Sequence, residues 1–400
     1  MEPLQLDDNV YWVGARDPGL EVFDLAMPLE RGTTYNAYLV QDERPALIDT
    51  VRPPFWEELR GRIEAVLDPS EIRYVVINHH EPDHAGSLLR VLELAPQAQV
   101  IISKAGEPFL RNTFHADLDF QKVKDGDAIS LGQSTLEFYT APFLHWPDNM
   151  FTYIRPGGIL CSSDAFGAHY STDELICDSF DPDLEPHVRY YYDCIMRPHR
   201  ARVAKGAAKA AELGVSILAP AHGPIYRDRP RYFVEKYVEW TADQPRDRKL
   251  IVLVFASVWD STRKMATEIE AGMAGADVEV RSYDLPFAPD AAVAADLARD
   301  LETADGIVLG APVMVGAVAK PMWDFLFTLA NLDVRGKQGA VFGSYGWQSK
   351  GLGLLEQVAQ HIGLRLLEPT LASQFVPDAD EAAQCREFGS KFAAAVAQAD

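Results

Sequence analysis

The chain has 400 residues, of which 48% are hydrophobic, and this length and composition are typical of a soluble protein with two or three globular domains. Its 59 acidic residues outnumber the 37 basic ones and give a formal net charge of -22, which argues against nucleic acid and anionic membranes as partners. Residues 1–8 lack the pattern of a signal peptide, and no apolar run is long enough to cross a membrane, so we expect a cytoplasmic protein that is not membrane-bound.

The first part of the chain predicts a series of short strands with few helices. A helix is expected over residues 53–67, where Asp68-Pro69 ends it, and helical periodicity returns from Gly86. A polar turn at residues 41–45 joins two of the strands. The expected strands cover residues 9–15, 35–40, 46–49, 74–77, 99–103, 135–140, 151–154, 159–162 and 215–218.

Histidine and acidic residues follow several of these strands at the point where each strand ends. Strand 74–77 leads into a stretch that packs four potential metal ligands into six residues, and such a cluster is costly to bury without cations. Four imidazoles and three carboxylates exceed what one tetrahedral zinc needs, so they predict two metals with one bridging carboxylate. The candidate ligands are His79, Glu81, Asp83, His84, His145, Asp164 and His222.

The alternative interpretation is that these residues are ordinary polar groups of the surface or core. For a single residue such as His145 that alternative is the more common case, but it does not explain four ligand types in one short stretch. The other histidines have no such group of potential ligands beside them. We expect His80 to point away from the metals because side chains alternate along an extended segment. The histidines left out of the site are His80, His115, His169, His187, His199 and His361.

The composition changes near residues 241–248, where a charged segment that contains proline and lacks apolar spacing is typical of a linker. We place the boundary at residue 248, which gives domains of residues 1–248 and 249–400. Beyond it strands and helices alternate, which predicts a doubly wound, five-stranded parallel sheet. The expected strands are 250–256, 278–283, 306–310, 339–342 and 364–367, and the expected helices are 262–274, 291–301, 320–329, 352–362 and 381–397.

Three loops at strand ends of this second domain are candidates for binding a cofactor. The first joins a strand to a helix, and its hydroxyl and backbone N–H groups can cradle an anion, although the same residues can serve only as a helix cap. The third offers the aromatic faces of Tyr345 and Trp347, and glycines there allow the backbone to approach a flat ring. The candidate residues are Ser257, Val258, Trp259, Asp260, Ser261, Thr262, Ala311, Pro312, Val313, Met314, Val315, Gly316, Ser344, Tyr345, Gly346 and Trp347.

These motifs resemble, over nearly the whole chain, those of the A-type flavodiiron proteins. The order His-x-Glu-x-Asp-His, His before Trp-Pro-Asp, Asp before Ala-Phe-Gly, and His-Gly is similar to their metallo-β-lactamase domain. Loop 257–262 resembles a flavodoxin phosphate loop, and Phe-Gly-Ser-Tyr-Gly-Trp is similar to the family's corresponding loop. Related zinc hydrolases usually have His where Glu81 stands, and an anionic oxygen donor is compatible with iron that changes oxidation state.

The resemblance implies an αββα sandwich fused to a five-stranded flavodoxin-like domain that binds FMN. It implies one iron held by His79, Glu81 and His145, a second iron held by Asp83, His84 and His222, and Asp164 bridging both. The implied activity is reduction of dioxygen to water, of nitric oxide to nitrous oxide, or both. The implied assembly is a head-to-tail homodimer or a dimer of dimers, which brings the flavin of one subunit to the irons of another.

The electron donor is expected to be a separate protein. The four cysteines, Cys161, Cys177, Cys194 and Cys385, never approach CxxC spacing, so no rubredoxin module is indicated within the chain. We read them as reduced thiols. A rubredoxin or a flavin/NADH reductase is therefore expected to deliver the electrons.

The sequence departs from the family at two places. The family tends to have Thr and Asn in the middle flavin loop, where residues 313–316 are Val-Met-Val-Gly, so we expect weaker FMN retention or a shifted flavin potential. Some members carry a His, a candidate proton donor, roughly where Phe23-Asp24 stands. Tyr191 or Tyr192 can supply a phenol near the metals, as a Tyr does in relatives, or can serve only as aromatic packing.

Two other functions remain open from the sequence. One is a zinc-dependent hydrolase with a flavodoxin-like accessory domain, against which Glu81 and the flavin loops argue. The other is a redox-inactive binding module whose flavin domain docks partners, against which the complete ligand set argues.

Overall fold

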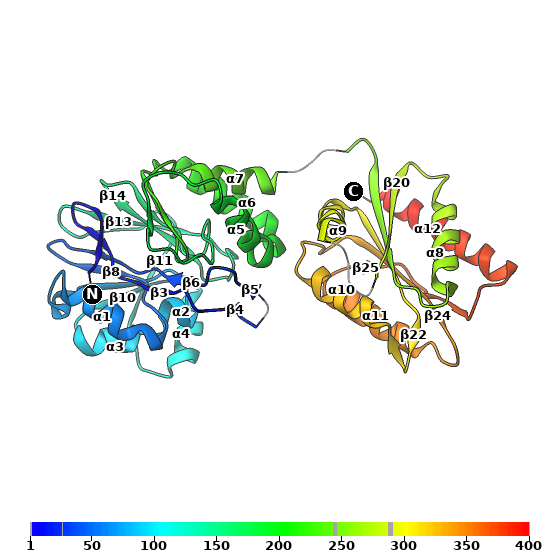
Figure 1. The fold of residues 1–400 in the computed structure, drawn as a ribbon, viewed down its shortest axis with the longest axis horizontal. Coiled ribbons are helices and arrows are strands. Elements are labelled where there is room, and N and C mark those ends of the chain that lie inside the picture. Colours follow the sequence, from blue (N-terminus) through cyan, green and yellow to red (C-terminus); the bar gives the residue numbers. More distant parts are fainter. Residues whose placement is uncertain (1, 26, 243–245, 287–290, 400) are drawn as a thin grey trace. The chain divides into compact units, whose positions relative to one another are not determined.

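The computed structural model describes residues 2–25, 27–242, 246–286 and 291–399. The chain divides into two compact units, Met1–Ala242 and Asp243–Asp400, which are described here one at a time (Figure 1). The division falls inside the predicted linker 241–248, of which residues 243–245 lie outside the described residues. Among the described helices, none combines the length and the apolar character that crossing a membrane requires.

The first unit contains two seven-stranded sheets. In spatial order the first sheet consists of β1 (Leu4–Asp7), β2 (Val10–Trp12), β7 (Tyr38–Val40), β8 (Ala46–Ile48), β9 (Tyr74–Ile77), β10 (Gln99–Ser103) and β11 (Phe120–Val123). The second consists of β12 (Ala128–Ser130), β13 (Thr135–Thr140), β14 (Met150–Arg155), β15 (Ile159–Cys161), β17 (Ile217–Ala219), β18 (Ile225–Tyr226) and β16 (Ile176–Cys177). Both sheets mix parallel and antiparallel pairs.

The two sheets pack face to face, and helices cover the outer face of each (Figure 1). Strand β9 shows how the sequence achieves this, because Val75 and Ile77 face the helices while Val76 between them faces the other sheet. Helices α1 (Trp56–Glu64), α3 (Leu88–Leu94) and α4 (Gly106–Phe114) cover the first sheet, and α5 (Leu184–Tyr191), α6 (Arg200–Glu212) and α7 (Tyr232–Thr241) cover the second. The predicted αββα sandwich is confirmed.

The strand predicted over residues 35–40 is wrong in one respect, because the structure breaks it in two. β6 (Thr33–Tyr35) pairs with β3 (Ala15–Asp17) in a separate ribbon, and β7 begins only at Tyr38. At the break, Asn36 donates from its side chain to Pro220 O over 2.8 Å and to Gly223 O over 3.0 Å. The interruption thereby fixes the loop that carries His222. The helix predicted over residues 53–67 ends earlier, at Glu64.

The second unit is a parallel sheet with helices on both faces (Figure 1). Its strand order is β20 (Val278–Asp284), β19 (Lys249–Phe255), β21 (Gly306–Gly310), β24 (Gln338–Tyr345) and β25 (Arg365–Leu366), and β26 (Leu371–Gln374) also pairs with β24. β25 and β26 thus share the last of five positions, which confirms the predicted doubly wound sheet. Helices α8 (Ser261–Met273) and α12 (Ala379–Gln398) pack on one face, and α9 (Ala291–Thr303), α10 (Lys320–Ala330) and α11 (Lys350–His361) pack on the other.

Candidate metal centre

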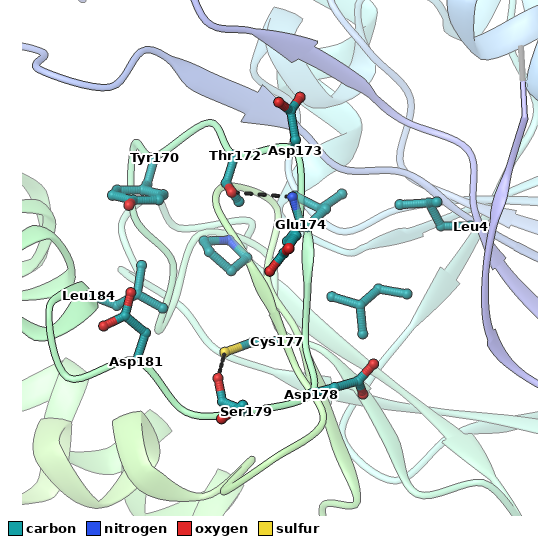
Figure 2. A pocket seen from close by; sticks show the side chains of 13 residues that line it. Leu4, Tyr170, Thr172, Asp173, Glu174, Cys177, Asp178, Ser179, Asp181 and Leu184 are labelled. Atoms are coloured by element: carbon teal, nitrogen blue, oxygen red, sulfur yellow. Dashed lines mark hydrogen bonds between the residues drawn. The ribbon is translucent and has the colours of Figure 1, made fainter.

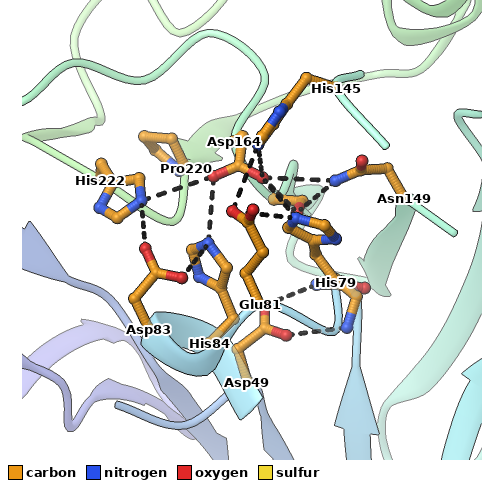
Figure 3. Close-up of polar contacts among 12 residues, drawn as sticks. Asp49, His79, Glu81, Asp83, His84, His145, Asn149, Asp164, Pro220 and His222 are labelled. Atoms are coloured by element: carbon orange, nitrogen blue, oxygen red, sulfur yellow. Dashed lines mark hydrogen bonds and ion pairs between the residues drawn. The ribbon is translucent and has the colours of Figure 1, made fainter. Parts of the chain in front are cut away.

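The seven candidate ligands converge at one edge of the sandwich, although four separate loops carry them (Figure 3). β9 ends at Ile77, and the chain then turns into the short helix α2 (Pro82–Ala85). Glu81 caps this helix, and Asp83 and His84 lie within it, so the turn brings side chains of one stretch toward a common centre. His145 lies between β13 and β14, Asp164 follows β15, and His222 follows β17. The loops of His145, Asp164 and His222 meet because they leave neighbouring strands of one sheet, and the loop after β9 joins them from the facing sheet.

The side chains form two groups whose donor atoms lie within 4.8 Å of one another, one of His79, Glu81 and His145 and the other of Asp83, His84 and His222. In the first group, Glu81 Oε2 lies 3.3 Å from His79 Nε2 and 3.5 Å from His145 Nε2. In the second, Asp83 approaches His84 Nε2 to 3.4 Å and His222 Nε2 to 3.2 Å. Donor atoms about 3 Å apart are what a common metal with bonds of about 2.1 Å requires.

Asp164 lies between the two groups and turns one oxygen to each. Its Oδ2 is 3.9 Å from His79 Nε2 and 3.8 Å from His145 Nε2. Its Oδ1 is 3.1 Å from His84 Nε2 and 3.5 Å from His222 Nε2 (Figure 3). This is the placement that a carboxylate bridging two cations would have.

Several of the ligating atoms are buried and have no hydrogen-bond partner among the described residues. They include Nε2 of His79, Oδ2 of Asp83 and Nε2 of His84. Buried polar atoms are nearly always satisfied, and an orphaned group needs a specific explanation such as an ion. The residues present therefore fit a pair of metal ions held by imidazole and carboxylate.

The pKa shifts in the cluster also indicate that its carboxylates require positive charge nearby. Burial would raise the pKa of Glu81, but the imidazoles of His145 and His79 overcome it and hold that pKa well below its usual range. Burial would lower the pKa of His84, but the Asp83 and Asp164 carboxylates raise it to about 10. Protons on the imidazoles thus balance the carboxylates when no other cation does.

Of the two tyrosines singled out in the sequence, Tyr191 lies at the centre and Tyr192 does not. The Tyr191 hydroxyl donates to Asp164 Oδ1 over 3.1 Å. Tyr192 packs instead against Tyr237 and Trp240, with ring centroids 5.1 and 5.2 Å away. α5 ends at Tyr191 and continues as a π-helical turn, a feature that often accompanies functional sites.

Asp148 is a residue of the site that the sequence reasoning missed. Both of its oxygens lie 3.2 Å from His79 Nδ1, and Oδ2 accepts the backbone N–H of His80 over 2.8 Å. His80 belongs to neither of the two ligand groups, but it does not stand apart from the site as expected. Its Nδ1 lies 3.0 Å from the same Asp148 oxygen, and its donor atom lies within 4.8 Å of those of His79 and Asp148. The position of Asp148 three residues after His145 was the available signal.

His169 and Thr33 are also close to the centre without having been singled out for it. The His169 ring is buried, and its centroid lies 4.8 Å from that of His222. Thr33 Oγ1 lies 2.9 Å from His169 Nδ1 and 3.4 Å from His222 Nδ1. No sequence signal distinguishes these two residues from ordinary core residues.

A cavity of about 350 Å³ opens onto the centre and is bounded in part by Glu81, Asp83, Phe23, Asp24 and Arg52. Asp24 therefore lies at the mouth of the site, in the segment where the resemblance places a His in some family members. Burial, followed by the negative charges of Glu81 and Asp83, raises the pKa of Asp24. Any small molecule that reaches the ligand groups from this side passes a carboxyl and a guanidinium.

A second cavity, of about 460 Å³, is lined by Tyr170 and residues 172–179 together with neighbouring side chains (Figure 2). It contains none of the seven candidate ligands. Its cysteine, Cys177, is buried and donates its thiol to Ser179 O over 3.1 Å. We assign it no part in the chemistry of the metal centre.

The three candidate cofactor loops leave the same edge of the parallel sheet, because they follow β19, β21 and β24. In the first loop, Ser257 Oγ accepts the N–H of Arg263 over 3.2 Å, so this residue also acts as a helix cap. Thr262 Oγ1 lies 2.9 Å from Ser344 Oγ, which ties the first loop to the third. The middle loop is a small hairpin of β22 (Val313–Met314) and β23 (Ala317–Val318), and its turn residues Val315 and Gly316 both have positive φ.

Large apolar side chains are exposed on these loops. Trp259 is 85% exposed, Trp347 is 81% exposed and Val315 is 95% exposed. Phe375, which follows β26 and was not singled out in the sequence, is 63% exposed, and its N–H donates to Tyr345 O over 2.9 Å. Exposed apolar groups of this density mark a binding site, and the edge at the carboxyl ends of the strands is where open α/β sheets bind nucleotides.

Comparison with known proteins matches both units. The model of the ODP family beta lactamase matches residues 33–223, and that of flavodoxin matches residues 253–389. The type A flavoprotein fprA of Rhodobacter capsulatus is 39% identical over 98% of this chain and 91% of that protein. The nitric oxide reductase of Moorella thermoacetica is 34% identical over 99% of both chains. The structure of rubredoxin oxygen:oxidoreductase from Desulfovibrio gigas has a TM-score of 0.72, with 29% identity over 98% of both chains.

Fold and site together define a two-domain protein in which a β-lactamase-like domain with an imidazole and carboxylate cluster is joined to a flavodoxin domain. The chain belongs to the flavodiiron proteins.

Proposed function

We propose that this protein is an oxidoreductase that reduces dioxygen to water, nitric oxide to nitrous oxide, or both, at a non-haem diiron site supplied with electrons through FMN. The observation that carries the proposal is the position of Asp164, with one oxygen toward each of two ligand groups, several of whose inner atoms lack a hydrogen-bond partner among the described residues. The relatives named for nitric oxide and for oxygen reduction support it.

His79, Glu81 and His145 would hold one iron, and Asp83, His84 and His222 would hold the other, with Asp164 shared. A bound pair of irons would supply electrons and open positions for a diatomic gas. The chain's own part is to fix the donors. Tyr191 and Asn149 each donate to one oxygen of Asp164, over 3.1 and 3.3 Å, and so hold the carboxylate in its shared orientation.

The flavodoxin domain would bind FMN at the three loops already described. Backbone N–H groups and hydroxyls of residues 257–262, at the start of α8, would hold the phosphate. The exposed rings of Trp259 and Trp347 would cover the flavin, which supplies one-electron transfer between a donor and the irons. A separate donor, a rubredoxin or a flavin/NADH reductase, is part of this proposal, and the Desulfovibrio relative is named for rubredoxin.

A head-to-tail homodimer, or a dimer of dimers, would bring the flavin of one subunit to the irons of another. The exposed apolar residues support it, because they surround both candidate sites. Val22 and Leu25 at the mouth of the metal centre are 45% and 99% exposed, and the flavin loops carry the exposed residues named above. An intracellular location is also proposed, because all four cysteines are free thiols.

Metal and flavin analysis of the purified protein separates this proposal from a zinc-dependent hydrolase. We expect about two irons per chain and the yellow spectrum of bound flavin after anaerobic reconstitution with ferrous iron and FMN. A colourless protein that retains zinc and does not bind iron would favour the hydrolase and overturn the proposal.

A further inference from the structure

The two ligand groups of the metal centre match in composition. Each contains two imidazoles and one carboxylate of its own, and each faces one oxygen of Asp164. The groups behind the ligands are therefore a main source of difference between the two metal positions.

Behind the first group lies an anion. Asp148 is buried, with 3% of its surface exposed, and both of its oxygens are 3.2 Å from His79 Nδ1. Its Oδ2 also accepts the backbone N–H of His80 over 2.8 Å and lies 3.0 Å from His80 Nδ1. His79 thus donates its outer N–H to a carboxylate.

Behind the second group, no ligand imidazole donates its outer N–H to a carboxylate. His222 Nδ1 donates to the backbone oxygen of Thr34 over 2.6 Å, with the Thr33 hydroxyl 3.4 Å away. His84 Nδ1 is buried and has no hydrogen-bond partner among the described residues. A buried acid on this side, Asp49, accepts two hydrogen bonds from Asn78, at 2.8 and 3.0 Å, and none from a ligand imidazole.

An imidazole whose outer N–H is donated to a carboxylate is a stronger metal ligand than one that donates to a carbonyl. The buried charge of Asp148 also attracts a cation directly, because a low-dielectric interior screens it poorly. The first effect acts on the first group alone. The second effect favours the first group, because Asp148 contacts a ligand imidazole and the buried Asp49 makes no hydrogen bond to one.

We infer that the two metal positions are unequal, and that the position formed by His79, Glu81 and His145 takes up its cation first and holds it more tightly. Asp148 is the positioning residue responsible, acting through His79. This inference rests on the proposed metal binding, and it assigns an order to the two positions that the ligands alone do not give.

Stepwise titration of the metal-free protein with Co²⁺ under anaerobic conditions tests the inference, with the visible bands of bound cobalt and calorimetry as readouts. We expect two steps in the wild-type protein. Asp148→Asn should weaken the tighter step about 10-fold to 100-fold and leave the weaker step in place. Thr33→Val, which removes the hydroxyl beside His222, is the matched variant and should spare the tighter step.

A crystal structure of the wild-type protein with one equivalent of Co²⁺ gives the same answer without any substitution, in case Asp148→Asn fails to fold. The anomalous signal should lie among His79, Glu81 and His145. A signal among Asp83, His84 and His222, two indistinguishable steps, or equal weakening of both steps by Asp148→Asn would overturn the inference alone. A protein that binds no metal at all would overturn the proposed function with it.

Discussion

Tyr191 donates its phenol hydrogen to Oδ1 of Asp164 over 3.1 Å, although the two residues are 27 positions apart in the chain. The same oxygen faces His84 and His222, so the phenol touches the carboxylate on the side of the second ligand group. A hydrogen bond to a charged group contributes about 1.5–3 kcal/mol. The orientation of the shared carboxylate therefore depends on this hydroxyl together with the Asn149 amide, which donates to the other oxygen.

Tyr191→Phe is predicted to keep both metals but to lower the rate of gas reduction by about tenfold or more, because a lost charged hydrogen bond is worth at least one factor of ten. Tyr192→Phe is the matched control, since this neighbour packs against Tyr237 and Trp240 instead. Stopped-flow reduction of each gas, with metal analysis of the same samples, measures the effect. Equal losses in the two variants would contradict the assigned role of Tyr191.

Asp164→Asn is predicted to lower the metal content from about two ions per chain to one or fewer. An amide has no charge to share between two cations and offers only one oxygen. Elemental analysis after desalting measures the content. Asp173→Asn, at a fully exposed carboxylate, serves as the control and should retain both ions. Full metal content in Asp164→Asn would show that this residue does not bridge.

The metal-free protein is predicted to lose stability as the pH rises above neutrality. Burial opposes protonation of His84, but Asp83 and Asp164 raise its pKa to about 10 in the folded state, against an ordinary value of 6.5. A histidine whose pKa is higher in the folded protein stabilises the fold fully at pH values below its pKa in the unfolded chain. This stabilisation is lost as the pH rises from about 6.5 to about 10. The loss is on the order of a few kcal/mol at most.

Urea unfolding at several pH values, with and without metal, measures this dependence. Metal ions replace the protons on the imidazoles, so the loaded protein should show little change in the same window. If the metal-free protein were equally stable at pH 6 and pH 10, the charge balance described for the cluster would be wrong.

Val315→Asn is predicted to raise both FMN affinity and stability. Val315 has φ of 53°, which is strained for a β-branched residue and acceptable for asparagine. Removing this backbone strain should raise the stability by about 1–3 kcal/mol. The new amide can also hydrogen-bond to the flavin. Quenching of FMN fluorescence measures the affinity, and thermal unfolding measures the stability.

Val238→Asn, at a partly exposed position on α7, is the control for adding an amide elsewhere. The wild-type protein should lose FMN during desalting more readily than Val315→Asn does. Stoichiometric retention of FMN by the wild-type protein would contradict the expectation that residues 313–316 weaken binding.

The sequence was sufficient to find the candidate ligands because four of them lie in one short stretch and the other three follow predicted strands. The same holds for the parallel sheet, whose strands and helices alternate regularly. Tertiary contacts decided the rest. Asp148 can be recognised as part of the site only from the contact between the loop after β13 and the end of β9. The choice of Tyr191 over Tyr192 depends on which side of the helix faces Asp164. Phe375 was missed because β26 is four residues long and follows β25 closely.

The most direct test of the proposed activity is the fate of electrons stored in reduced flavin. Protein loaded with iron and FMN, reduced anaerobically and mixed with dioxygen or nitric oxide, should reoxidise its flavin rapidly with at least one gas, yielding water or nitrous oxide. The same protein loaded with FMN alone should reoxidise slowly with nitric oxide and give hydrogen peroxide with dioxygen. Identical rates and products with and without iron would contradict the account.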